Sequence, residues 1–574
     1  MTTPSPAQED RVDAERPPRA LLSWAACVVL AAVVGLRVRG FVDHTDIHVW
    51  DELLYYFAGR DLVTDGVLPA VHLMPAYSVF YGALSLLPIP GHLPDFMGML
   101  CMFGAPLAMW WALSPRLGRT WSLTAAICYA MGSAVDQGYC NGSTSSGHVY
   151  AFTAILTSLG IGMMARERWL WGWCLLLLVA QTRAETALWI LAFATITALS
   201  PSLRRRVRWS PVACLLSLSL VVLVAAHPDI RARSWLAFCQ HYGRAAYEAD
   251  LRAQYPEAVD ERDPQRLLQI VGGQQNLQRI LDGFRLSMLR PETFVERDFP
   301  GATSVVGALR REPVRFVTHM ANNATVAPKQ LLLASLPART GITLAWVIGA
   351  TLTILASLGW IFGRRRLRQE RADHRGSGPW ILLLATSPLS LLATLPVETR
   401  TNLMFPLLPM LLAFWFGGLR AACTTTAATR RWGGPVAVGL ALLLAVLVPR
   451  PFSGPPPDLQ HRDTLKVLGA ALPPPNADRR IGILTSWGRV PMRLLQRDDL
   501  DLHGTAEGKG QLLADHLRQI NPDYIVDTPE LRAEMGHFAD LQAVLASPSR
   551  RCVATRGRVR LLQREPIDGN VEHR

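Results

Sequence analysis

Long apolar segments recur along most of this chain, and they restrict its fold more than any other feature. Of its 574 residues, 50% are hydrophobic, and the mean hydropathy is +0.19. A helix needs roughly 20 mostly apolar residues to cross a bilayer. Because backbone polar groups inside a bilayer must be hydrogen-bonded within the protein, repeated segments of this kind predict a polytopic α-helical membrane protein.

Positive charge gathers in short loops just outside these apolar segments. The formal net charge is +13. A basic chain could bind nucleic acid, but loops such as 203–208 and 363–368 follow the preference of arginine for the cytoplasmic side of a membrane. We therefore expect no nucleic-acid partner, a cytoplasmic N-terminus, an external C-terminus and eleven spans. These are residues 20–38, 96–113, 121–135, 149–165, 169–181, 186–199, 211–226, 342–362, 380–395, 403–419 and 435–448.

The remaining segments complete a predicted domain plan. The apolar run 73–87 is short and contains Pro75, so we expect an amphipathic helix in the membrane interface rather than a span. The plan consists of a cytoplasmic tail (1–19), a membrane domain (20–449) with external loops at 39–95 and 227–340, a proline-rich linker (450–457) and an external domain (458–574).

Both larger external segments have a predicted internal structure. The polar loop 227–340 is expected to be helical, and the C-terminal domain to be a small α/β unit, because predicted strands alternate with helices there. The helices expected in the loop are 234–253, 267–288 and 313–326. In the C-terminal domain we expect strands at 480–485 and 523–527, helices at 511–520 and 530–545, and a hairpin at 552–562.

Two adjacent carboxylates, Asp51 and Glu52, follow the first predicted span. Carboxylates near a membrane boundary are costly unless they face a cavity or a partner. The pair could instead be solvated in a loop, or cap a helix over 53–62. As a functional pair, the two residues would be catalytic, because a positioned carboxylate can act as a general base.

The order of features around this pair resembles the GT-C superfamily of membrane glycosyltransferases. The acid pair follows the first span, opens a helix with paired tyrosines and precedes Pro75. The similarity is to protein O-mannosyltransferases and lipid A aminoarabinose transferases, a family 39-like group, and covers about residues 20–450. It implies an enzyme of a bacterial-type inner or plasma membrane that moves a sugar from a polyprenyl-phosphate donor to a hydroxyl at the external face, with Asp51 as general base.

Several arginines are candidates for binding the donor phosphate, because a guanidinium donates two hydrogen bonds at once. Arg183 lies in a tight hairpin that is similar to the family's arginine turn, although a structural ion pair with Glu185 is the alternative. Arg400 stands in the last outer loop, where the family often places a basic residue. The remaining candidate substrate-binding residues are Arg60, Tyr55 and His148, the last of which also fits an ordinary loop histidine.

A divalent metal is a possible cofactor. His44, Asp46 and His48 alternate just before the acid pair, and such donors suit a metal, although they also fit a polar loop. The second outer loop departs from the family, because Asp136 is its only acid, and this leaves the metal site open. A disulfide is also left open, since the spacing of the cysteines expected outside the membrane does not decide a pairing among Cys140, Cys239 and Cys552.

Two functions of other classes compete with the transferase. A transporter or lipid flippase of a cell-envelope precursor would usually show a two-fold repeat of spans, and none is visible. A membrane scaffold would leave the acid pair without a role. The sequence does not identify the sugar, or whether the acceptor is a glycan, a lipid or a protein.

Overall fold

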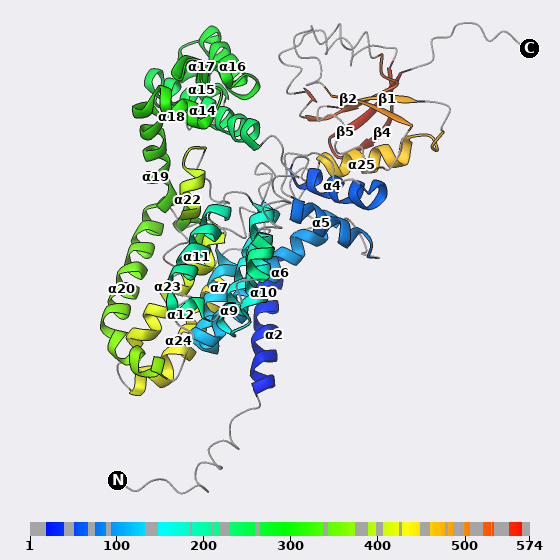
Figure 1. Ribbon diagram of the computed structural model, residues 1–574. Helices are drawn as coiled ribbons and strands as arrows, with labels where there is room; N and C mark the ends of the chain where they lie inside the picture. Colours follow the sequence, from blue (N-terminus) through cyan, green and yellow to red (C-terminus); the bar gives the residue numbers. More distant parts are fainter. Residues whose placement is uncertain are drawn as a thin grey trace, which may run out of the picture.

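The computed structural model describes most of the helices and one sheet (Figure 1). The described residues are 19–39, 51–66, 75–87, 93–132, 147–183, 186–205, 207, 211–216, 230–258, 264–336, 342–372, 389–397, 404, 406–423, 427–447, 460–476, 480–485, 495, 499–504, 521–529, 531–532 and 550–564. Within these residues the chain is mostly helical, and its strands form one sheet near the C-terminus.

The largest part is a bundle of apolar helices. Helices α6 and α9 pack along each other, and α20 packs along α23. Three described helices, α6, α9 and α20, contain stretches long and apolar enough to cross a membrane. The bundle helices are α2 (Arg19–Val38), α6 (Leu93–Leu117), α7 (Arg119–Met131), α9 (Gly147–Ala165), α10 (Trp169–Thr182), α11 (Thr186–Leu199), α20 (Ile342–Ala372), α23 (Leu408–Cys423) and α24 (Ala427–Leu447).

The outer surface of α20 shows that the bundle belongs in lipid. Only 22% of its apolar stretch Thr343–Phe362 is buried within the protein. Its exposed large apolar side chains are Leu344, Trp346, Val347, Ile354, Leu355, Leu358, Ile361 and Phe362. A continuous apolar face of this kind is rare on proteins that are surrounded by water. The protein is therefore a membrane protein, as predicted.

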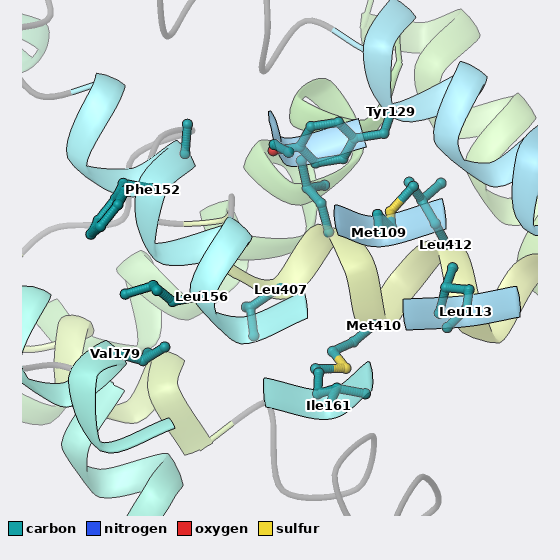
Figure 2. Packing of buried hydrophobic residues seen from close by; sticks show 14 of the residues in the cluster. Met109, Leu113, Tyr129, Phe152, Leu156, Ile161, Val179, Leu407, Met410 and Leu412 are labelled. Atoms are coloured by element: carbon teal, nitrogen blue, oxygen red, sulfur yellow. The ribbon is translucent and has the colours of Figure 1, made fainter. Parts of the chain in front are cut away.

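Side chains from several helices interlock inside the bundle. Figure 2 shows Met109 and Leu113 of α6, Leu156 and Ile161 of α9, and Met410 of α23 among the buried residues. Helices α20 and α23 approach closely where Gly359 faces Gly418. A Cβ atom on either glycine would collide with the backbone of the opposite helix, so only glycine fits at this crossing. Small residues at a crossing let helix backbones meet in this way in membrane proteins.

The largest differences between the predicted and observed ends of the described spans are at the end of α20 and at the start of α24. Span eight was expected to end at 362, but α20 continues through the basic run to Ala372, because neither proline nor a positive-φ residue interrupts it. Span eleven was expected to start at Pro435, but α24 starts at Ala427 and contains this proline. The predicted spans 211–226 and 380–395 lie partly outside the described residues, with helix at 211–216 and in α22 (Leu389–Thr394). The count of eleven spans stays a prediction.

Residues 230–336 form a helical segment, as predicted. One expected helix, 267–288, is in fact two, because Gly272 and Gly273 adopt φ values of 74° and 146° between them. Two short helices were not predicted. The helices are α14 (Ile230–Gln254), α15 (Pro264–Val271), α16 (Gln274–Leu289), α17 (Glu292–Asp298), α18 (Val305–Arg311) and α19 (Pro313–Ser335).

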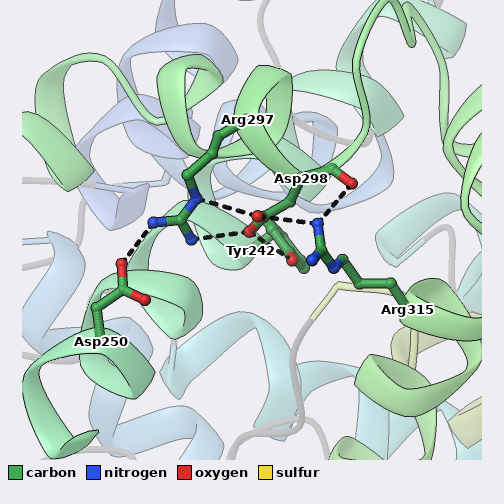
Figure 3. A network of polar contacts seen from close by, with 5 residues as sticks. All are labelled: Tyr242, Asp250, Arg297, Asp298 and Arg315. Atoms are coloured by element: carbon green, nitrogen blue, oxygen red, sulfur yellow. Dashed lines mark hydrogen bonds and ion pairs between the residues drawn. The ribbon is translucent and has the colours of Figure 1, made fainter.

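An ionic network holds this helical segment together (Figure 3). The Asp298 carboxylate accepts hydrogen bonds from Tyr242 at 2.9 Å and from Arg315 at 3.0 Å. Arg297 donates a hydrogen bond of 3.0 Å to Asp298 and one of 2.6 Å to Asp250. Burial alone would raise the pKa of Asp298, but the hydrogen bonds from Arg297 and Tyr242 together with the nearby positive charges hold it below its usual range.

The C-terminal domain, residues 460–564, is an α/β unit, as expected. Its sheet has the strand order β2-β1-β3-β5-β4, with β1 parallel to β2 and β3, and β5 antiparallel to β3 and β4. The predicted strands and hairpin are confirmed, whereas β2 was not predicted. Most of the predicted helices 511–520 and 530–545 lies outside the described residues. The elements are α25 (Gln460–Ala471), β1 (Ile481–Thr485), β2 (Leu500–Gly504), β3 (Tyr524–Asp527), β4 (Arg550–Arg556) and β5 (Val559–Arg564).

Candidate functional site

Two short helices, α4 (Asp51–Asp65) and α5 (Pro75–Ser85), pack against each other at one end of the bundle (Figure 1). Glycines at their crossing allow a close approach. A Cβ atom on Gly82 would lie 2.6 Å from the carbonyl oxygen of Gly59, and one on Gly59 would lie 2.6 Å from the Gly82 nitrogen. Helix α5 has 11 residues and rises about 16 Å, so it is too short to cross a hydrocarbon core of about 30 Å.

The buried carboxylate of Glu52 joins three helices. Its Oε1 accepts a hydrogen bond of 2.6 Å from the Tyr77 hydroxyl and a second from the Tyr81 hydroxyl, both on α5. The same oxygen lies 3.3 Å from Nδ1 of His148, in the first turn of α9. Glu52 and His148 are only 2% and 3% exposed. The first turn of α4 is therefore fixed to both α5 and α9.

The surroundings of Glu52 keep it ionised. Burial alone would raise the pKa of its carboxyl, but the charge and hydrogen bond of His148 and the bonds from Tyr77 and Tyr81 together lower it below 4.5. Burial first, and then the nearby Glu52 charge, raise the pKa of both tyrosines well above 10.0, so they remain hydrogen-bond donors at neutral pH. The cluster is thus a buried carboxylate held by two tyrosine hydroxyls, with the His148 ring beside it.

Aromatic rings pack around this cluster. The ring of Tyr55, which is 2% exposed, lies 4.8 Å from that of Tyr77 in an edge-on arrangement. Tyr77 also lies 5.1 Å from Tyr81 and 5.3 Å from Phe152 of α9. The structure thus places Tyr55, a predicted substrate-binding residue, in the packing between α4 and α5.

Arg183 meets the same turn of α9 from another side. It follows the last residue of α10, and its guanidinium carbon lies 4.2 Å from the ring centre of Tyr150. The hydroxyls of Thr153 and Thr182, 3.0 Å apart, tie α9 to α10 next to this contact. The first turn of α9 therefore contacts Glu52 through His148 and Arg183 through Tyr150. The alternative partner of Arg183, Glu185, lies outside the described residues.

For the other predicted site residues, the structure gives a position on a helix at most. Asp51 begins α4 directly before Glu52, but its side chain is not described. Arg60 is half-buried on α4, about two turns after Glu52. Among the described residues, no group of three or more potential metal ligands occurs. Outside the described residues lie Arg400 and the candidate metal ligands His44, Asp46 and His48.

Sequence reasoning missed Tyr77, Tyr81 and Tyr150. The two tyrosines of α5 are four residues apart and hence share one face of a helix, which was a signal available in the sequence. Tyr150 had no comparable signal. The structure also bears on the disulfide that the sequence left open. Cys239 and Cys552 are free thiols, and Cys140 lies outside the described part of the chain.

Two kinds of comparison found no relative. No protein-family model matches the sequence, and no curated protein sequence matches it.

Solved structures do show similarity to this chain. An oligosaccharyltransferase of Archaeoglobus fulgidus in the apo form matches 96% of this chain and 75% of its own length, with 12% identity and a TM-score of 0.43. The same protein in complex with Zn and sulfate matches 91% of this chain and 70% of its own length, with 13% identity and a TM-score of 0.42. ArnT of Cupriavidus metallidurans bound to undecaprenyl phosphate matches 95% of this chain and 97% of its own length, with 13% identity and a TM-score of 0.35.

Both are GT-C glycosyltransferases. This is the superfamily that the sequence around Asp51 and Glu52 resembles. With TM-scores below 0.5, these matches assign no role to any residue of this chain.

Proposed function

We propose that this protein is a membrane glycosyltransferase that moves a sugar from a polyprenyl-phosphate donor to an acceptor hydroxyl at the external membrane face. One observation carries the proposal. The buried Glu52 carboxylate fixes the first turn of α4 against the first turn of α9, where Tyr150 also supports Arg183. The helix that begins with Asp51 and the guanidinium of Arg183 therefore both contact the first turn of α9.

The two acids have different roles in this mechanism. Asp51 is the general base that removes the proton from the acceptor hydroxyl, and a base must come within hydrogen-bond reach of that proton. Glu52 is 2% exposed, and its Oε1 already serves two tyrosines and a histidine. Glu52 is therefore a positioning residue that holds the backbone next to Asp51, rather than a second base.

Arg183 is the proposed contact for the donor phosphate. As the sugar leaves, negative charge develops on the phosphate, and fixed positive groups stabilise this charge. The ring of Tyr150 below the guanidinium limits its movement, and Arg183 is half-buried, so less water screens its charge. Arg60 and Arg400 are further candidates for the same phosphate. The candidate metal ligands lie outside the described residues, and no step of this mechanism involves a metal.

The decisive test is sugar transfer by membranes that contain the full chain and a polyprenyl-phosphate sugar. Asp51→Asn keeps the shape of the side chain but removes the base, and should lower the rate by roughly two to four decades. The matched control is Asp65→Asn, which changes an exposed acid at the other end of α4 and should leave the rate unchanged.

Two outcomes would contradict the proposal. Full activity of the Asp51→Asn variant would remove the mechanism. If the wild-type protein moved labelled lipid across the bilayer without any transfer of sugar, the transporter or lipid flippase would be the better function.

A further inference from the structure

Helix α25 lies between the C-terminal sheet and α4 (Figure 1). On one side, Val467 and Leu468, which are 3% and 0% exposed, belong to the core beneath the sheet. On another side, Leu465 packs against Leu53 and Phe57 of α4, which are 0% and 3% exposed. The C-terminal domain thus covers a face of the helix that begins with Asp51.

An ion pair fixes α25 to the membrane bundle as well. Nη2 of Arg462 lies 2.7 Å from each carboxylate oxygen of Asp95, in the first turn of α6. The side chains of Arg462 and Asp95 are 15% and 18% exposed, so the pair is largely shielded from water. Helix α6 in turn packs along α9, which carries His148. The sheet, α4 and α6 are therefore connected through one short helix.

The first turn of α4 is consequently restrained on two faces. Glu52 contacts α5 and α9, whereas the next residue, Leu53, contacts α25. Successive residues of a helix point about 100° apart, so these two contacts oppose movement in different directions. Both act on the turn that starts at Asp51.

We propose that the C-terminal domain holds this turn in place through α25, with Arg462 and Leu465 as positioning residues. Its effect on catalysis rests on the function proposed above. A displacement of a reacting group by about 1 Å can slow a reaction about a hundredfold, so a helix that carries a base gains from support on both faces. The C-terminal domain then acts on the rate without contacting the donor.

The chain offers a matched control on α25 itself. Asp463 accepts a hydrogen bond of 3.1 Å from Nε of Arg556 on β4. This pair lies within the C-terminal domain and joins α25 to its own sheet. Asp463→Asn therefore breaks an ion pair of the same helix without removing a contact to α4 or α6.

The first experiment measures hydrogen exchange of the α4 amides in the full-length protein in lipid nanodiscs. Leu465→Ala and Arg462→Gln should each speed exchange about tenfold over residues 55–58, whose amides bond to the carbonyls of the first turn, whereas Asp463→Asn should not. The double variant Asp95→Arg with Arg462→Asp should restore slow exchange, because it rebuilds the pair in reverse. Unchanged exchange in both Leu465→Ala and Arg462→Gln would overturn the proposal, whatever the protein's activity.

The second experiment measures the kinetics of sugar transfer with the same variants. We expect kcat to fall about tenfold with little change in the KM for the donor, because Arg183 and its support are untouched. The reversed ion pair should recover kcat. The positioning role would be overturned if Leu465→Ala and Arg462→Gln sped exchange but left kcat unchanged. It would also be overturned if Asp463→Asn lowered kcat as much as they do. Absence of transfer by the wild-type protein would instead refute the proposed function, and the exchange data would still decide whether α25 restrains α4.

Discussion

At the scale of single residues, the candidate site depends on how Glu52 is satisfied. Removing one partner of a buried charge costs more than the net worth of the pair, because the other charge stays buried. Glu52→Ala leaves the buried hydroxyls of Tyr77 and Tyr81 without their acceptor and should lower the free energy of unfolding by roughly 1–3 kcal/mol. Tyr81→Phe removes one hydrogen bond to the carboxylate and should cost about 1.5–3 kcal/mol.

Unfolding of the purified protein in detergent measures both effects. Tyr56→Phe is the control, because its ring lies 5.9 Å from that of Tyr81 while its hydroxyl takes no part in the Glu52 contacts. It should change stability by less than about 0.5 kcal/mol. A Tyr81→Phe variant as stable as Tyr56→Phe would show that the Glu52 cluster does not hold α4.

The same carboxylate predicts a dependence of stability on pH. Because the folded protein lowers the pKa of Glu52 below its ordinary 4.5, the unfolded chain binds its proton more readily. The stabilisation is therefore complete above the unfolded pKa and is lost as the pH falls through the lower, folded pKa. Glu52→Gln removes this contribution, so its stability relative to wild type should improve as the pH falls below about 4.5. A constant difference between the two proteins at pH 7 and at pH 3.5 would contradict this reading.

At the scale of elements, the crossing of α4 and α5 is set by two glycines. Gly59→Ala or Gly82→Ala places a methyl group against the opposite backbone and should separate the helices, at a cost of roughly 1–3 kcal/mol. Gly469→Ala on α25 is the control, because no atom lies within 4 Å of its added Cβ, and there alanine should be neutral or stabilising by up to about 1 kcal/mol. Thermal unfolding and sugar transfer report the two effects, and equal stability of all three variants would exclude a close crossing.

Sequence patterns predicted the long apolar helices and every strand except β2, because both depend on local hydrophobic periodicity. They failed where the chain itself gives no local signal. The extension of α20 through its basic run shows this, since charged residues do not by themselves end a helix. The sequence also singled out Glu52, which the structure buries among several contacts, whereas the role of Asp51 stays a prediction. That Glu52 binds Tyr77 and Tyr81, 25 and 29 residues away, could not be read from the sequence, because only the packing of α4 on α5 brings them together.

At the scale of the whole molecule, the parts predicted to lie outside the membrane gather at one end of the bundle, and the side that this end faces stays a prediction. In Figure 1 the helical segment 230–336, the C-terminal domain and the helices α4 and α5 lie toward one end of the bundle. The N-terminal end of α2 and the C-terminal end of α20 lie toward the other. The candidate site thus shares its end with the two large polar parts, whereas the basic run of α20 is at the far end.

Reporter fusions test this sidedness directly. Arginine-rich short segments stay on the cytoplasmic side, so fusions after residues 206 and 366 should report the cytoplasm, and those after 300 and 520 the exterior. The fusions at 206 and 366 are a control for those at 300 and 520, because in either orientation of the protein the two pairs should report opposite sides of the membrane. If fusions at 300 and 520 scored as cytoplasmic, α4 and Arg183 would face the cytoplasm. The proposed reaction at the external face would then be wrong, although the contacts of Glu52 and α25 would remain. Opposite results at 300 and 520 would instead require an odd number of crossings between residues 337 and 459 in place of the four predicted. They would also separate the C-terminal domain from α4, in conflict with the packing of Leu465 against Leu53.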